Sequence, residues 1–301
     1  MTKTVACLAG DGVGPELMAA ATRALDRVAA LHHLDLVDRH LPFAGEAVTR
    51  SGHPLPPETR AGYRDVDAIL VASPGEPAFA GVKADLHLAW RVARVHVGPR
   101  HDVVVAGPVG EWANATALAR AFDSAESRRG RILVVGESPE WRRAVAEERA
   151  RRDGLHVEEA TLGETLVRLR DDASSLDVIV TEAHLVDGLV DAAAAFAGSH
   201  AAVAHAWLPD EGPGVFAPGR TAPDDVAGFG VVDPTAMLLA TSLMLAEGLK
   251  RRSASRTLER AVGVAVDRNG HSDDTRGFTD AVIELLPQSR TDVEHFDEAW
   301  R

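Results

Sequence analysis

The chain opens with a short apolar run, a glycine-rich turn and a long amphipathic segment, and this order constrains the fold more than any other feature. Residues 4–9 (TVACLA) predict a buried strand, and residues 15–31 carry apolar side chains at helical spacing. Between them, residues 10–16 (GDGVGPE) supply glycines that allow a tight turn and a proline that suits a first helical turn. Such a turn either serves structure alone or offers a helix N-terminus to an anionic ligand.

Apolar runs continue to alternate with helix-period segments, which indicates an α/β fold. Strands are predicted at residues 67–72, 102–106, 131–135 and 176–181, and helices at residues 140–152, 187–197, 235–249 and 278–286. The segment 235–249 is apolar on most of its surface, so we expect a buried helix there. Residues 209–234 are rich in Gly, Pro and Asp and predict a long ordered loop, a kind of loop that is usually functional.

Charge and cysteine usage exclude several classes of protein. The formal net charge of −13 repels nucleic acid and anionic membranes, so we expect neither as a partner. Cys7 is the only cysteine, which excludes an internal disulfide and a cysteine-based zinc site. We see neither a signal peptide nor an apolar stretch of about 18 residues, the length that a membrane helix needs, and we expect a cytoplasmic protein.

Three arginines lie close together in this acidic chain, at Arg91, Arg94 and Arg100. Forked guanidinium groups bind carboxylates in a bidentate manner, so the stretch is a candidate site for a small di- or tricarboxylate. The spacing alone favours a solvated helix face.

Asp187 and Asp191 are four residues apart, on one face of a predicted helix. Two such carboxylates can share a hard cation such as Mg²⁺ or Mn²⁺, although an exposed acidic face has the same pattern.

Arg220 lies in the long loop, within residues 218–225 (PGRTAPDD). Glycine, arginine and aspartate together suit the phosphates and ribose hydroxyls of a cofactor. A surface loop that binds no ligand has the same composition.

Taken together and in this order, the motifs resemble the isopropylmalate/isocitrate dehydrogenase family, the β-decarboxylating dehydrogenases. The resemblance covers nearly the whole chain. Besides the opening GDGVGPE, it rests on residues 42–47 (PFAGEA), 52–56 (GHPLP), 181–191 (TEAHLVDGLVD), 216–234 and 279–283 (TDAVI). It implies a two-domain α/β fold with a mixed parallel and antiparallel sheet flanked by helices. Residues 1–101 plus 206–301 would form the larger, cofactor-binding domain, and residues 102–205 a smaller domain with the metal-site helix.

The resemblance also implies an activity, the NAD- and metal-dependent oxidation and decarboxylation of a 2-hydroxy diacid, and a dimer in which each subunit completes its partner's site. Asp187 and Asp191 fall on two metal-ligand positions, and the arginine stretch fits a substrate-binding helix and the turn after it. The implied cofactor-binding residues are Gly12, Val13, Gly14, Arg220, Asp224, Asp225 and Asp233. Asp225, or its neighbour Asp224, would bind the adenosine ribose hydroxyls, and an acid at that point favours NAD over NADP.

The chain departs from the family's pattern at residues that the chemistry uses. The catalytic lysine position falls at or near Gly136, and the aspartate that the partner subunit supplies falls near Gly163. The single tyrosine, Tyr63, and the three lysines, Lys3, Lys83 and Lys250, all lie elsewhere. The arm that clasps the dimer is absent between Arg100 and residue 116. The missing residues are largely those that act across the dimer interface.

These departures leave the catalytic residues unassigned and three hypotheses open, the first of which offers one candidate for the proton-transfer group. The first is a divergent NAD-dependent dehydrogenase with altered proton-transfer groups, for which His184 is a stand-in acid or base. The second is a non-catalytic or repurposed member that binds a ligand or serves as a subunit, either as a homodimer or beside an active paralogue. The third is a metal-assisted decarboxylation without hydride transfer.

Overall fold

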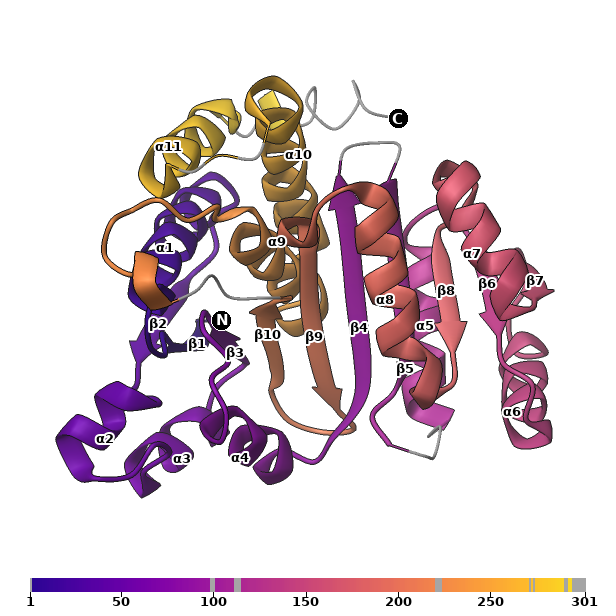
Figure 1. Cartoon of the computed structure of the whole chain (residues 1–301), viewed down its shortest axis with the longest axis horizontal. Coiled ribbons are helices and arrows are strands. Elements are labelled where there is room, and N and C mark those ends of the chain that lie inside the picture. Colours follow the sequence, from indigo (N-terminus) through magenta and orange to yellow (C-terminus); the bar gives the residue numbers. More distant parts are fainter. Residues whose placement is uncertain are drawn as a thin grey trace. The chain divides into compact units, whose positions relative to one another are not determined.

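The computed structural model describes residues 2–97, 101–110, 115–219, 224–270, 272, 274–289 and 292–293. The chain forms two compact units (Figure 1), one of residues 1–87, 204–206 and 211–301, the other of residues 88–203 and 207–210. We predicted that the smaller part begins at residue 102. The second compact unit begins at residue 88 instead, because the strand that carries Arg91 and Arg94 pairs with the strand that follows it.

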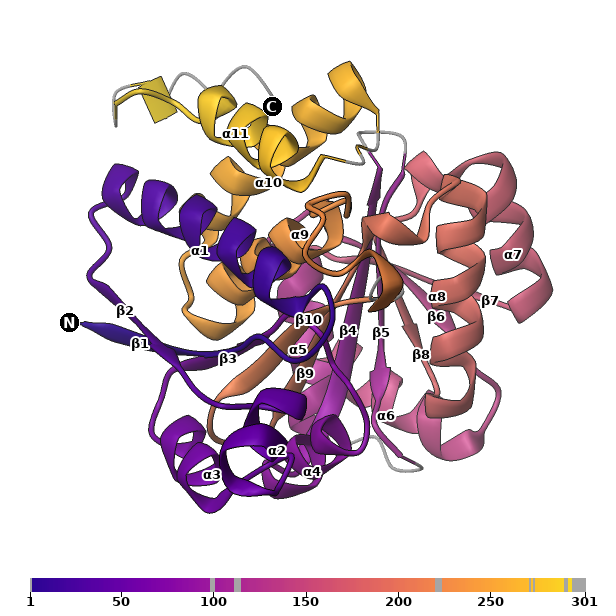
Figure 2. The same ribbon diagram turned by 60° about the vertical axis from the view of Figure 1, so that its left-hand side comes forward.

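The first unit contains four parallel strands in the order β2-β1-β3-β10. Their bounds are Lys3–Leu8 (β1), Leu36–His40 (β2), Ala68–Val71 (β3) and Gly214–Pro218 (β10). The helices are Gly14–Leu31 (α1), Gly45–Ser51 (α2), Pro57–Arg64 (α3), Ala78–Asp85 (α4), Thr235–Leu243 (α9), Arg252–Asn269 (α10) and Thr275–Leu285 (α11), with short turns at Asp224–Val226 (η3) and Met244–Gly248 (η4). Helix α11 packs against both α1 and α10 (Figure 2).

The opening strand, turn and helix are confirmed as β1 and α1, and α9 is buried at all nine of its residues as predicted. The helical segment continues from α9 through the π-helical turn η4 to Gly248, one residue short of the predicted end. The prediction of one long loop over residues 209–234 is wrong in part, since it contains β10. The short apolar run of β10 was not predicted as a strand because glycines and prolines flank it. Parallel pairing with β3 supplies hydrogen bonds to its backbone.

The second unit has the strand order β4-β5-β8-β6-β7, in which β4 and β5 are antiparallel and the other neighbours are parallel. The strands are Leu88–Val97 (β4), His101–Pro108 (β5), Arg131–Val135 (β6), His156–Ala160 (β7) and Val178–Thr181 (β8). The residues of β9, Val203–Pro209, are divided between the two units. The helices are Ala115–Glu126 (α5), Pro139–Arg149 (α6), Leu162–Asp171 (α7) and Ala183–Ala197 (α8), with short turns at Ala173–Ser175 (η1) and His200–Ala202 (η2).

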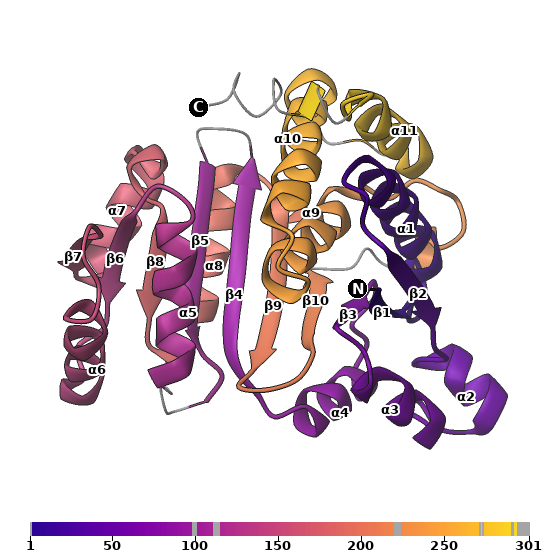
Figure 3. The same cartoon turned by 180° about the vertical axis from the view of Figure 1, so that it is seen from behind.

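Helices cover both faces of these strands. Helix α8 lies over one face (Figure 1), and α5 lies over the opposite face (Figure 3). On the α8 side, β4 and β5 contribute alternate residues such as Ala93, Val95, Val103 and Val105 to a core that α8 closes with Val186. The predicted α/β class with a mixed sheet flanked by helices is confirmed. Within the described residues, no helix is long and apolar enough to cross a membrane.

Candidate functional site

The glycine-rich turn of the first unit is fixed by its own backbone and by close packing. The amide of Gly14 donates to the carbonyl of Asp11 at 2.9 Å, which closes the turn at the start of α1. Gly10 has a φ of +74°, and a Cβ there would lie 2.3 Å from the carbonyl oxygen of Ser73. The single N–H of Gly45 donates to both oxygens of the Asp11 carboxylate, at 2.7 and 2.9 Å. Packing therefore excludes a side chain at residue 10.

The three cofactor residues predicted in this turn have different surroundings. Gly12 has a φ of +58° and is half-buried, whereas the Val13 side chain is only 1% exposed and belongs to the core. Gly14 is the first residue of α1, and a Cβ there would lie 2.0 Å from the carbonyl oxygen of Ala9. The backbone of the turn, and not the Val13 side chain, is thus the part that can approach a ligand.

The second predicted cofactor segment is the loop that follows β10. Asp225 lies in η3 and is exposed, and the Asp233 carboxylate accepts a hydrogen bond from the amide of Thr235 at 2.8 Å. Arg220 lies outside the described residues, as does the side chain of Asp224. Asp233 therefore helps to begin α9, and Asp225 is the described acid of this loop that is open to solvent.

Sequence reasoning missed one residue that joins these two segments. The Glu16 carboxylate, in the first turn of α1, accepts a hydrogen bond from the amide of Gly230 at 3.0 Å. Glu16 is part of the GDGVGPE motif, but nothing in the motif indicates a contact with a residue more than 200 positions later.

Arg91 and Arg94 lie on a strand, so the predicted substrate-binding helix is wrong at these two residues. Arg91 and Arg94 belong to β4, which pairs with β5 over its length. Side chains alternate between the faces of a strand, so residues three apart point in opposite directions. Arg91 faces the α8 side with Ala93 and Val95, and Arg94 faces the other side. Arg100 lies outside the described residues.

Arg94 belongs to an internal network of ion pairs. Its guanidinium donates to the Asp102 carboxylate at 2.9 and 3.0 Å, and Arg128 donates to the other oxygen of Asp102 at 2.8 Å. Arg128 also donates at 2.7 Å to Asp177, whose side chain is fully buried. Burial opposes the ionisation of Asp102, but Arg128 and Arg94 outweigh it and hold the pKa of this carboxyl well below its ordinary value. Arg94 is therefore a structural residue.

Arg91, by contrast, reaches the predicted metal-binding helix. Its guanidinium donates a hydrogen bond to the carboxylate of Asp187 and lies 5.8 Å above the ring of Trp207. The Asp187 side chain is 79% exposed, and Asp191 is exposed one turn further along α8. In the described part of the chain, no third His, Asp or Glu lies close enough to complete a three-residue metal site with these two. Two exposed carboxylates thus lie on one face of α8, and the Arg91 guanidinium, whose side chain is only 19% exposed, contacts one of them. Sequence reasoning missed the Trp207 ring beside Arg91.

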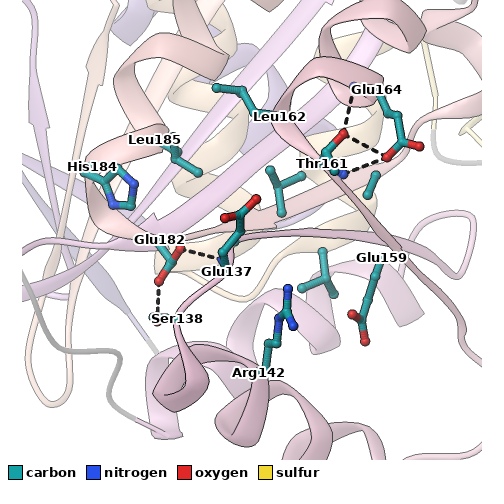
Figure 4. Close-up of a pocket in the computed structure, with 14 residues that line it drawn as sticks. Glu137, Ser138, Arg142, Glu159, Thr161, Leu162, Glu164, Glu182, His184 and Leu185 are labelled. Carbon is teal, nitrogen blue, oxygen red and sulfur yellow. Dashed lines mark hydrogen bonds between the residues drawn. The ribbon is translucent and has the colours of Figure 1, made fainter.

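A cavity of about 600 Å³ lies at the carboxyl ends of β6, β7 and β8 (Figure 4), the edge at which α/β sheets commonly bind ligands. Its polar lining includes Glu137, Ser138, Arg142, Glu159, Glu182 and His184. The Ser138 hydroxyl and the Glu137 amide both donate to the Glu182 carboxylate. Burial opposes the ionisation of Glu182, but these hydrogen bonds outweigh it and lower its pKa.

The two positions where the resemblance places the partner-directed lysine and aspartate differ sharply. Gly136 lines the cavity, and a Cβ there would lie 2.6 Å from Trp141 Cδ1 and 2.8 Å from Glu182 Oε2. Gly163, near the start of α7, has nothing within 4 Å of such a Cβ. Packing therefore excludes a side chain at Gly136, the lysine position, and leaves space for one at Gly163, the aspartate position.

The tyrosine and the lysines serve structure in the first unit. Tyr63 is fully buried in α3, and its hydroxyl donates to Asp85 at 2.5 Å. Burial and this hydrogen bond raise the pKa of Tyr63 above its ordinary range. Lys3, Lys83 and Lys250 form ion pairs with Asp67, Glu76 and Glu247, respectively. None of the four lies in the unit that carries Asp187.

Individual proteins of known function are similar to this chain over most of their length. The chain is 29% identical to a 3-isopropylmalate dehydrogenase of Synechococcus sp. (strain CC9902), with 86% of this chain and 89% of the relative covered. It is 25% identical to the 3-isopropylmalate dehydrogenase of Streptococcus thermophilus, with 95% and 100% covered.

Solved structures show the same fold. A β-decarboxylating dehydrogenase of Thermococcus kodakarensis in its apo form superposes with a TM-score of 0.80 at 21% identity, with 99% of each chain covered. The isocitrate dehydrogenase of Methylococcus capsulatus superposes with a TM-score of 0.78 at 18% identity, with 95% of this chain and all of that chain covered.

The sequence profile of the isocitrate/isopropylmalate dehydrogenase family matches residues 4–89 and 110–284. The stretch between the two matches holds Arg91, Arg94 and Arg100. The matches span well over half of the chain, and with the fold and the shared motifs they show that this protein belongs to the isocitrate/isopropylmalate dehydrogenase family.

Proposed function

We propose that the protein is an NAD-dependent oxidoreductase that uses Mg²⁺ or Mn²⁺ and acts on a 2-hydroxy acid with a second carboxylate. The observation that carries the proposal is the contact between Arg91 and Asp187, one helical turn from Asp191. A group that binds carboxylates and a pair that suits a hard cation lie side by side in one unit.

The Arg91–Asp187 ion pair also suggests how such a ligand binds. Without a ligand, the two charges neutralise each other, and because the Asp187 carboxylate is largely exposed the ion pair contributes little stability. A complex of a divalent cation with a carboxylic acid carries a positive charge that the aspartates can bind and a negative charge that the arginine can bind. It can therefore separate the pair, with the cation at Asp187 and Asp191 and the carboxylate at Arg91, so that binding of the cation and of the acid depend on each other.

The first unit supplies the elements that fit a dinucleotide. At the start of α1, Gly10 and Gly14 leave no room for side chains, which keeps a bare backbone at a helix N-terminus. Asp225 is an exposed acid of the kind that binds ribose hydroxyls and disfavours a 2′-phosphate, which supports NAD over NADP. When bound, the cation would stabilise negative charge that develops on the substrate and NAD would accept the hydride.

Proton transfer is the step for which the residues of this chain differ most from the family. Tyr63 donates a hydrogen bond to Asp85 in the other unit, and the three lysines form ion pairs there. His184 is exposed on α8 one turn before Asp187, and it is our candidate acid or base. General acid–base groups typically accelerate a reaction by about 10²–10⁴-fold, so we expect slow turnover.

A second function is favoured by one observation, the closed packing around Gly136. A subunit that cannot place a lysine at this position cannot complete a partner's site in the family's way. The protein would then bind its ligand without turning it over, or act beside an active paralogue. In the first case we expect a homodimer in the cytoplasm, and in the second a heteromer.

The test is NADH formation at 340 nm with a panel of 2-hydroxy diacids, with Mg²⁺ present and at high enzyme concentration. We expect slow turnover that Asp187→Asn and Arg91→Gln abolish. Asp171→Asn is the matched control, because Asp171 is another exposed aspartate of the second unit in contact with an arginine. Absence of turnover with every acid would overturn the proposal of an oxidoreductase. Calorimetric binding of NAD in that case would support the second function, a protein that binds its ligand without turning it over or acts beside an active paralogue.

A further inference from the structure

The loop between η3 and α9 is held from two sides by residues distant in sequence. From one side, the Glu16 carboxylate accepts the hydrogen bond of the Gly230 amide at 3.0 Å. From the other, the Thr275 amide donates to the Gly230 carbonyl at 2.9 Å. The Thr275 hydroxyl oxygen accepts from the Val232 amide at 2.9 Å and donates to its carbonyl at 2.5 Å. Both polar groups of the Gly230 and Val232 backbones are thereby engaged.

Thr275 and Glu16, the two residues that hold the loop, differ in how completely their side-chain polar atoms are hydrogen-bonded. Thr275 is 4% exposed and its hydroxyl both donates and accepts, as expected of a structural residue. The second oxygen of Glu16, Oε1, is buried and has no hydrogen-bond partner among the described residues. A buried carboxylate oxygen without a donor is unfavourable. An uncharged acceptor could hold the Gly230 amide at lower cost, so the hydrogen bond to Gly230, and not the negative charge of Glu16, is what bears on the loop.

The place of the contact indicates its role. Glu16 lies in the first turn of α1, two residues after Gly14 and four after Gly12, and Gly230 follows Asp225 by five residues. The loop must bend twice to meet Glu16, with positive φ values at Gly228 (+81°) and Gly230 (+68°). One hydrogen bond therefore joins the first turn of α1, next to the glycine turn, to the loop that follows Asp225.

We propose that Glu16 is a positioning residue of the dinucleotide site, which holds the loop that carries Asp225 against the glycine turn of α1. Thr275 supports the same loop from α11. This inference rests on the proposed binding of NAD. It concerns how the site is assembled and does not require turnover.

The test compares Glu16→Ala and Glu16→Gln by hydrogen exchange at the Gly230 amide and by calorimetric titration with NAD. We expect Glu16→Ala to accelerate exchange at Gly230 and to raise the Kd for NAD by about tenfold or more, the loss typical of a hydrogen bond to a charged group. The side-chain carbonyl of glutamine can still accept from Gly230, so we expect Glu16→Gln to stay within about threefold of the wild type in both measurements.

Two further variants separate positioning from stability. Thr275→Val removes the support on the opposite side and is expected to weaken NAD binding as Glu16→Ala does, and Thr275→Ser is expected to restore it. Thr59→Val removes another buried hydroxyl of the first unit, which donates to the Pro42 carbonyl at 2.6 Å, far along the chain from the loop. It is expected to lower the melting temperature without changing the Kd for NAD.

The inference is overturned if Glu16→Ala changes the Kd for NAD no more than Thr59→Val does, or if Glu16→Gln fails to restore binding. If the wild type binds no NAD, the proposed function fails, but exchange at Gly230 still tests the contact. Unchanged exchange in Glu16→Ala would then show that Glu16 does not hold the loop.

Discussion

The indole of Trp141 lies directly against the backbone of Gly136, so that a Cβ on residue 136 would be 2.6 Å from Trp141 Cδ1. The same Cβ would be 2.8 Å from the Glu182 carboxylate, and Gly136 has a φ of +153°. Trp141 is anchored in α6, whose first turn is capped by Ser138. Packing thus requires glycine at the position where the resemblance places a catalytic lysine.

Gly136→Ala is expected to lower the free energy of unfolding by about 1–3 kcal/mol, since the backbone is unfavourable for a side chain and Trp141 must move. Gly136→Lys should destabilise the protein at least as much and should not increase turnover. Chemical denaturation and the 340 nm assay measure the two effects. Gly163→Ala is the control, because its Cβ meets nothing within 4 Å and alanine favours a helix, so we expect equal or slightly higher stability. Equal effects of the two alanine variants would contradict this account.

Tyr63→Phe is expected to lower the free energy of unfolding by about 1–2 kcal/mol, because it removes a hydrogen bond to the ionised Asp85. The cost should stay modest, since Arg60 remains bonded to the same carboxylate. NAD binding and turnover should be unchanged, which calorimetry and the NADH assay test. A large loss of turnover at unchanged stability would assign this tyrosine to the reaction.

Asp102→Asn is expected to cost about 3 kcal/mol or more at pH 7, because it leaves Arg94 and Arg128 without their shared negative partner. The folded-state pKa of Asp102 lies below its unfolded value of about 3.9, so the ionised group stabilises the fold above about pH 4. This contribution is lost as the pH falls through the folded pKa. Melting temperatures of wild type and variant should therefore differ most at neutral pH and converge on strong acidification. A constant difference would show that ionisation of Asp102 is not the cause.

The Arg91–Asp187 pair is expected to contribute little to stability. A double-mutant cycle with Arg91→Gln and Asp187→Asn should give a coupling of about 0.2–1 kcal/mol that decreases with added salt, since Asp187 is largely exposed. Binding of Mg²⁺ by Asp187→Asn should instead weaken by about tenfold or more, as expected for the loss of one of few carboxylate ligands. A coupling above about 2 kcal/mol would indicate a structural pair like Arg94 and Asp102.

Much of the fold followed from local patterns. The turn from β1 into α1 could be predicted because glycine and proline act on the nearest backbone angles, and the buried strands because continuous apolar runs need burial on both faces. The strand β10 could not, since only its pairing with β3 compensates for a sequence rich in Gly and Pro. The conformation at Arg91 and Arg94 was misjudged for a similar reason, because pairing of β4 with β5 determines that this segment is extended.

The sequence by itself determined the family-like order of motifs and the two aspartates on one helix face. It also determined that no tyrosine or lysine lies close to these aspartates along the chain. These are properties of residue identity and short spacing. Only the tertiary structure decided that Arg91 faces Asp187 while Arg94 faces Asp102, that Glu16 holds Gly230, and that Trp141 closes the space over Gly136. Each of these contacts depends on strand pairing or helix packing between distant segments, and such contacts are set by the burial of the whole core rather than by any local pattern.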